Sequence, residues 1–203
     1  MDLYQIIAVH NRPWSKNEIF FFSLLFCLTF VGCLVMVRKK KIGVGQMVTF
    51  LIGMCYLAIV FASTVFTRAP GVRQHQLEVF WSWKEIFGIG GRGRLGGCAP
   101  EFLLQENILN MILLFPIGFL LPFIRGRKVA WKWGILVGCV ISGTIEVLQL
   151  VLCRGLFEFD DVIHNSVGCM IGCAVGNIGY YLSLIHISEP TRRKETSRMP
   201  SSA

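Results

Sequence analysis

Residues 19–37 read IFFFSLLFCLTFVGCLVMV, a run of 19 residues without a charge. At ~1.5 Å of rise per residue, a helix of this length crosses the ~30 Å hydrocarbon core of a bilayer. Arg38-Lys39-Lys40-Lys41 follows the run. A cleavable signal peptide has its basic residues in front of the apolar core and a small-residue cleavage site behind it, so the order found here predicts a retained transmembrane helix.

Four further apolar blocks follow the first one, at residues 44–66, 108–124, 129–152 and 162–181. Only 16% of the 203 residues are charged and 54% are hydrophobic, which is too little charge for the surface of a soluble domain. We therefore predict an all-α fold, a polytopic transmembrane helix bundle of about five spans, in residues 19–181.

The net charge of +8 comes from Lys and Arg beside the apolar blocks, so it indicates membrane topology and no nucleic-acid partner. The short loops at 38–41 and 125–132 are both basic and should be cytoplasmic. Residues 1–18 and the loops at 67–105 and 153–161 then lie outside. The five cations of the long 67–105 loop argue weakly against this orientation.

No cofactor and no metal site are predicted. Six of the eight cysteines lie within apolar blocks, where cysteine acts as a small hydrophobic residue. Cys169 and Cys173 share a helix face, but no His or carboxylate beside them completes a metal-binding set. Residues 88–93 match G-x-G-x-x-G without the strand and helix of a nucleotide-binding unit, so they indicate a flexible loop.

The C-terminal tail, residues 182–203, differs in character from the rest of the chain. Its start, LSLIHISEPTR, and its end, TSRMPSSA, resemble the in-frame translation of a transposase-based sequencing adapter. We therefore expect native sequence only to about Tyr181. An open reading frame that continues through this tail in genomic DNA would contradict that interpretation.

Polar and ionisable side chains gather at one end of the last three predicted spans. Such groups cost ~2.5–3.5 kcal/mol at the bilayer centre, so their presence indicates a role. Ser142, Glu146 and Gln149 are spaced by four and then three residues, which places them on one helix face. The predicted topology brings eight candidate ligand-binding residues to the outer face: Asn107, Asn110, Glu146, Gln149, Arg154, Asp160, Asp161 and Asn165.

Structural roles compete with ligand binding at these positions. Glu146, Arg154 and Asp161 form either a salt bridge that holds the 153–161 loop or a ligand-binding or catalytic site. A stripe of glycines lies on the same helix face as Asp161, and it is more typical of close helix packing than of a ligand site: Gly168, Gly172 and Gly176.

Several segments in this region form a recognisable series. They are ENILN at 106–110, LFPIGFLLP at 114–122, SGTIEVLQ at 142–149, Arg154, EFDDVIHN at 158–165, and Gly168. In this order the chain resembles the VanZ-like family of bacterial membrane proteins over about residues 45–181. One departure is Glu158, where family members often have Asp. The resemblance implies a Gram-positive plasma membrane protein and a link to low-level resistance to teicoplanin, a lipidated glycopeptide antibiotic.

Two functions follow as hypotheses. The first is a cell-envelope protein whose outward-facing polar site binds a lipid headgroup, a wall precursor or a lipoglycopeptide. The alternative is a membrane-embedded hydrolase or transferase that acts on an envelope lipid. In it, Glu146 would be a general base, Arg154 would hold a phosphate, and Asp160 and Asp161 would bind a divalent cation with Glu158. Five spans without an inverted repeat disfavour a transporter. Membrane lipids are the expected partners. The sequence does not indicate whether the protein is a monomer or an oligomer.

Overall fold

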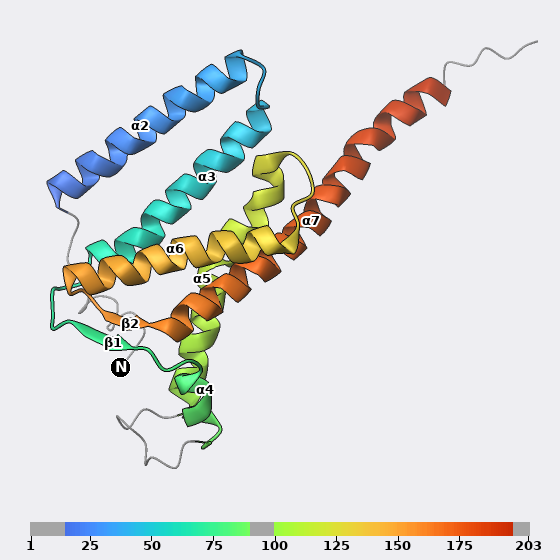
Figure 1. Cartoon of the computed structure of the whole chain (residues 1–203). Helices are drawn as coiled ribbons and strands as arrows, with labels where there is room; N and C mark the ends of the chain where they lie inside the picture. The colour runs from blue at the N-terminus through green and yellow to red at the C-terminus, as the bar shows by residue number, and fades with distance from the viewer. Residues whose placement is uncertain (1–14, 90–99, 197–203) are drawn as a thin grey trace, which may run out of the picture.

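The computed structural model describes residues 15–89 and 100–196 of the chain (Figure 1). Five helices in this part are long and apolar enough to cross a membrane, which confirms the predicted helix bundle. They are α2 (Lys16–Arg38), α3 (Val44–Phe61) with its π-helical continuation η1 (Ala62–Phe66), α5 (Pro100–Arg125), α6 (Trp131–Leu152) and α7 (Phe159–Thr196).

Two helices begin before the predicted spans because polar residues join their first turns. The fifth span was predicted to begin at 162, but α7 begins at Phe159, and Asp160 and Asp161 lie in its first turn, where carboxylates interact favourably with the helix dipole. Helix α5 likewise begins at Pro100, eight residues before the apolar block. At its other end α7 passes residue 181 and continues to Thr196, and the adapter origin of the tail stays a prediction.

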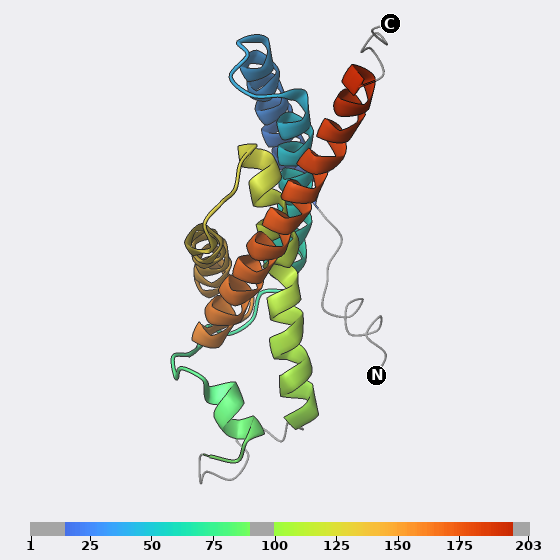
Figure 2. The same cartoon turned by 90° about the vertical axis from the view of Figure 1, so that its right-hand side faces the viewer.

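Helix α7 lies between α5 and α6, and both views show this layering (Figures 1 and 2). Glycines allow the close approach. A Cβ atom added to Gly168, Gly172 or Gly176 would overlap a backbone carbonyl oxygen of α5, and one added to Gly134 or Gly138 would press on α7. Small residues let helix backbones pack closely in membranes, so the predicted packing role of the glycine stripe is confirmed.

Helices α2 and α3 form a hairpin at the side of this three-helix core (Figure 1). Ser15 and Glu18 form a reciprocal capping box at the start of α2, which satisfies two backbone N–H groups of its first turn. Cys33 is the buried residue of α2, and most Phe and Leu side chains of this helix are exposed. An apolar exterior of this kind suits a helix that contacts lipid.

Short elements cover one end of the bundle. Strand β1 (Gln74–Gln76) pairs in parallel with β2 (Leu156–Glu158), so that His75 lies opposite Phe157. Helix α4 (Trp81–Ile86) follows β1 and contacts α5. At this end η1 and α6 end, and α5 and α7 begin. We call it the polar end, because the polar residues predicted for the site lie here.

The opposite end of the bundle carries the loops at residues 39–43 and 126–130, and we call it the basic end. The two short cationic clusters and the polar candidates therefore lie at opposite ends of the helices. The assignment of the polar end to the outside stays a prediction.

Candidate functional site

Five carboxyl groups gather at the polar end, and we call them the carboxylate cluster: Glu106, Glu146, Glu158, Asp160 and Asp161. They come from α5, α6, β2 and α7. Glu158 lies in β2, outside the spans. Burial raises its pKa to about 8, and repulsion from the other four members adds to the effect. The other four carboxyl groups therefore lie close enough to Glu158 for their charges to repel its charged form.

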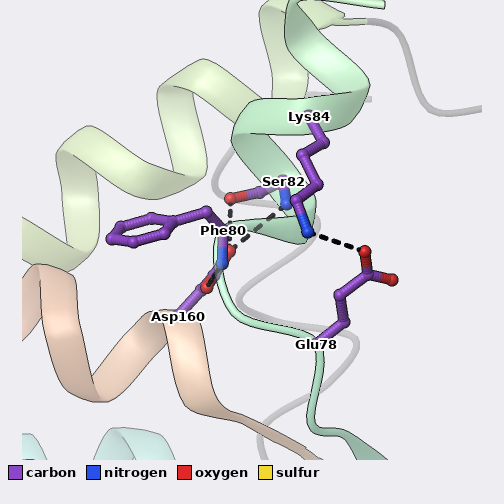
Figure 3. Close-up of polar contacts among 5 residues, drawn as sticks. All are labelled: Glu78, Phe80, Ser82, Lys84 and Asp160. Atoms are coloured by element: carbon purple, nitrogen blue, oxygen red, sulfur yellow. Dashed lines mark hydrogen bonds and ion pairs between the residues drawn. The ribbon is translucent and has the colours of Figure 1, made fainter. Parts of the chain in front are cut away.

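Asp160 is fully buried and accepts three hydrogen bonds from the segment that starts α4 (Figure 3). Its donors are the backbone N–H of Phe80 at 2.5 Å, and the backbone N–H at 3.2 Å and hydroxyl at 2.8 Å of Ser82. Phe80 has a left-handed backbone with φ of 58°, a conformation that a non-glycine residue adopts only when its surroundings hold it. Asp160 thus caps and anchors α4. Asn107, on α5, also donates to the Ser82 hydroxyl, at 3.2 Å.

Asp161 and Asn165 face the neighbouring helices. The Asn110 amide on α5 donates to Asp161 Oδ1 at 2.6 Å. The Asn165 amide donates to the Ser142 hydroxyl on α6 at 2.9 Å, and that hydroxyl lies 3.5 Å from the Asp161 carbonyl oxygen. These two predicted site residues therefore join the start of α7 to α5 and α6.

Glu146 lies deeper in the bundle, with 2% of its surface exposed. Its Oε2 accepts a hydrogen bond from the backbone N–H of Glu158 at 2.9 Å. A buried carboxylate on α6 therefore holds the end of β2. Glu146, Arg154 and Asp161 were predicted to form either a salt bridge that holds the 153–161 loop or a ligand-binding or catalytic site. No ion pair joins them in the described residues, and hydrogen bonds to the backbone hold the loop instead. The ligand-binding or catalytic site stays a prediction.

Arg154 and Gln149 contact the end of η1. Arg154 Nη1 donates to the carbonyl oxygen of Phe66 at 2.9 Å and lies 3.5 Å from that of Val65. Gln149 Nε2 donates to the carbonyl oxygen of Thr64 at 3.0 Å. The end of a helix leaves carbonyl groups without backbone partners, and these two side chains satisfy them.

Arg68 lies at the cluster and was not among the predicted site residues. It follows η1 and is exposed, and its charge acts on Glu106, Glu146 and Asp161. A Cβ atom added to Gly155 would lie 3.1 Å from its Nη1, so the glycine makes room for the guanidinium group. No carboxylate of the described residues lies within ion-pair distance of it. Its position directly after the second apolar block was a signal for a role at the polar end.

Two buried polar atoms of α7 have no partner in the described residues: His164 Nδ1 and Asn165 Oδ1. The indole N–H of Trp83, on α4, donates to His164 Nε2 at 2.7 Å. Indole nitrogen is only a donor, so Nε2 must accept and Nδ1 carries the proton of the neutral ring. Trp83 and Asp160 together fix α4 on α7.

The polar end can act chemically through a surplus of carboxyl groups beside one exposed guanidinium group. Both carboxylate oxygens of Asp160 accept hydrogen bonds from the start of α4. The carboxyl groups of Glu106 and Glu158, in contrast, accept no hydrogen bond from the described residues. No group of three His, Cys, Asp or Glu side chains with metal-binding geometry occurs in residues 15–89 and 100–196. The arrangement suits a ligand that carries hydrogen-bond donors or a cation for the carboxyl groups and an acceptor for Arg68.

An apolar groove opens between α2 and α3 in the half of the bundle nearer the polar end. It has a volume of about 620 Å³. Among its lining residues are Phe22, Phe26 and Cys27 from α2, and Met54, Leu57 and Ala58 from α3. Phe22 also packs edge to face against Phe66, with ring centroids 5.6 Å apart. Arg154 binds the Phe66 carbonyl, so one end of the groove lies near the contact between Arg154 and η1.

A comparison with protein families gives a match that contains the whole carboxylate cluster. The model of the VanZ/LLP1 family matches residues 47–180, which include α5, α6, the start of α7 and every member of the carboxylate cluster. Searches found no match among curated proteins and no match among solved structures. The family match covers more than half of the chain, and the described residues contain five helices long and apolar enough to cross a membrane. The chain therefore belongs to the VanZ/LLP1 family as a multi-pass membrane protein.

Proposed function

We propose that this protein binds an amphiphilic envelope molecule at its polar end, and that the polar end faces outward from a Gram-positive plasma membrane. The ligand class is a lipid headgroup, a wall precursor or a lipoglycopeptide. Binding would lower susceptibility to teicoplanin. Membrane lipids are the surrounding partners, and the basic loops at 38–41 and 125–132 support this orientation.

The observation that carries the proposal is the position of Arg68. Its charge acts on Glu106, Glu146 and Asp161, yet it forms no ion pair with any carboxylate of the described residues. Charges that attract one another but do not pair can both bind a polar group of a ligand. A sugar or peptide headgroup offers donors for the carboxyl groups and acceptors for Arg68.

The α2–α3 groove supports a ligand with an acyl chain. It lies in the apolar part of the protein, in the same half as the cluster, and its lining is almost entirely apolar. A molecule with its headgroup beside Arg68 would place a hydrocarbon chain at this depth. Burial of each CH₂ group contributes ~0.8 kcal/mol, so even a short chain adds strongly to the affinity.

The test is teicoplanin susceptibility in cells that express the wild type, Arg68→Gln, Glu146→Gln or Asp161→Asn at equal membrane levels. We expect protection by the wild type and its loss in Arg68→Gln and in at least one carboxylate variant. Lys84→Gln is the matched control, because Lys84 is an exposed cation of the polar end that pairs with Glu78. Equal protection by Arg68→Gln and the wild type would contradict the proposal.

The enzymatic alternative keeps one specific support, the contact between Glu146 and the backbone of Glu158. A pair of neighbouring carboxyl groups suits general acid–base chemistry. Arg154 and Asp160, which the alternative also requires, are engaged by backbone groups instead. Incubation of the purified protein with labelled envelope lipids and Mg²⁺ tests it, and turnover that is lost in Glu146→Gln would favour the enzyme over the binding protein.

A further inference from the structure

A second polar feature lies at the basic end, where the chain passes from α5 to α6. It is a hollow of about 130 Å³, and we call it the basic pocket. Its lining residues are Arg125, Arg127, Lys128, Val129, Ala130 and Trp133. One water molecule occupies ~30 Å³ of the liquid, so the hollow has room for a group the size of a phosphate.

The backbone of the basic pocket is held in place by α7. The Asn177 side chain forms two hydrogen bonds with Val129: its Oδ1 accepts from the backbone N–H at 2.9 Å, and its Nδ2 donates to the carbonyl oxygen at 2.8 Å. The Tyr180 hydroxyl donates to the carbonyl oxygen of Gly126 at 2.6 Å. Gly126 has a positive φ of 63°, which glycine adopts without strain. The cationic side chains therefore project from a fixed loop.

The charge of the pocket is unbalanced. The sequence contains no Asp or Glu between Glu106 and Glu146, and no ion pair joins Arg125, Arg127 or Lys128 to a described residue. Helix α6 starts after Ala130 without a side-chain cap and without an acidic residue in its first turn. Its first N–H groups and the positive end of its dipole thus add to the three cations.

Aromatic side chains place the pocket at the membrane interface. The Arg125 guanidinium lies 5.7 Å from the centre of the Trp133 ring, and the Lys128 ammonium lies 5.8 Å from that of Tyr181. Trp and Tyr concentrate at headgroup depth, where cations on the same rings meet lipid phosphates. Basic pockets between transmembrane helices bind anionic headgroups in this way.

We propose that the basic pocket binds the phosphate of an anionic phospholipid headgroup, at the membrane face opposite the carboxylate cluster. Arg125, Arg127 and Lys128 would contact the phosphate, and the first turn of α6 would face it. The lipid is preferred to free phosphate because the pocket lies at the ends of two spans and beside interfacial aromatic rings. The inference is independent of the ligand proposed for the polar end.

Native mass spectrometry of the full-length protein, titrated with phosphatidylglycerol or phosphatidylcholine, tests the proposal. We expect phosphatidylglycerol to bind the wild type more tightly, and the affinity to fall at least tenfold in Arg127→Gln/Lys128→Gln. The matched control is Lys39→Gln/Lys40→Gln, which removes two cations from the other basic loop and should bind like the wild type. Arg127→Gln alone should fall between the two, which provides a second variant with less change.

Three outcomes would overturn the proposal. Wild-type affinity in Arg127→Gln/Lys128→Gln would exclude the pocket. An equal loss in Lys39→Gln/Lys40→Gln would assign the effect to overall charge. Displacement of phosphatidylglycerol by millimolar inorganic phosphate would assign the site to free phosphate instead of a lipid.

Discussion

The two ends of the bundle use their charged side chains in opposite ways. At the polar end, charged side chains hold the backbone: Asp160 anchors α4, Glu146 holds β2 and Arg154 satisfies the end of η1. At the basic end a neutral side chain of α7, Asn177, holds the loop backbone, and the charged side chains of the loop are exposed. A charged residue that is hydrogen-bonded to backbone groups thus has a structural role, whereas an exposed charged residue without such bonds is available to bind a ligand.

The largest effect that follows from this comparison is expected for Asp160→Ala. The change leaves the backbone N–H groups of Phe80 and Ser82 without their acceptor, and Ser82 is buried. We expect a loss of about 3 kcal/mol in the free energy of unfolding. Thermal unfolding in detergent measures it, with Lys84→Ala as the exposed control that should change stability by less than ~0.5 kcal/mol. Equal melting temperatures of the two variants would contradict the anchoring role.

A smaller loss is expected for Asn177→Ala at the basic end. Val129 is buried, and this change removes both hydrogen bonds to its backbone. We expect a cost of about 2 kcal/mol, because buried backbone groups would be left unpaired. Thermal unfolding again measures it. Val129 also contacts the pocket, so phosphatidylglycerol binding should weaken too, and a stable variant with unchanged lipid binding would show that α7 does not fix the loop.

The pH dependence of stability should come from the polar end. Burial and its acidic neighbours raise the pKa of Glu158 from 4.5 to about 8, so the folded state binds its proton more tightly than the unfolded state. The contribution of Glu158 to stability is then fully present below pH 4.5 and is lost as the pH rises to about 8. Unfolding at pH 5 and pH 8.5 should show a smaller difference in Glu158→Gln than in Glu158→Asp, which keeps the carboxyl group. Equal differences would exclude Glu158 as the source.

The smallest effect is expected for Arg127→Gln. Its side chain is exposed and forms no ion pair with the described residues, so the free energy of unfolding should change by less than ~0.5 kcal/mol. This near-neutral result, set beside Asp160→Ala, would sharpen the contrast between the two ends. A loss above ~1 kcal/mol would mean that the basic end is also held by its charged side chains.

The spans and the convergence of polar residues could be predicted because bilayer thickness dictates the length of an apolar run, and helical spacing dictates which residues share a face. The partners of individual side chains could not. Asp160 and Asp161 are adjacent in sequence, yet about 100° apart around α7. One therefore meets α4 and the other α5.

Arg154 and Arg68 were misjudged for a related reason. The apolar pattern of residues 44–66 does not distinguish α-helix from the π-helical turns of η1, so the free carbonyl groups that attract Arg154 were not foreseen. Arg68 was counted among the cations of a long loop. Only the fold shows that η1 ends beside α6 and brings this residue to the carboxylates.

The most direct test of the polar end is equilibrium binding of teicoplanin, and of teicoplanin without its acyl chain, to the protein in phosphatidylcholine nanodiscs. We expect the wild type to bind teicoplanin, Arg68→Gln to bind it at least tenfold more weakly, and the deacylated molecule to lose affinity for both. Equal affinities of the wild type and Arg68→Gln for teicoplanin would contradict the claim that Arg68 and the carboxylate cluster bind the headgroup.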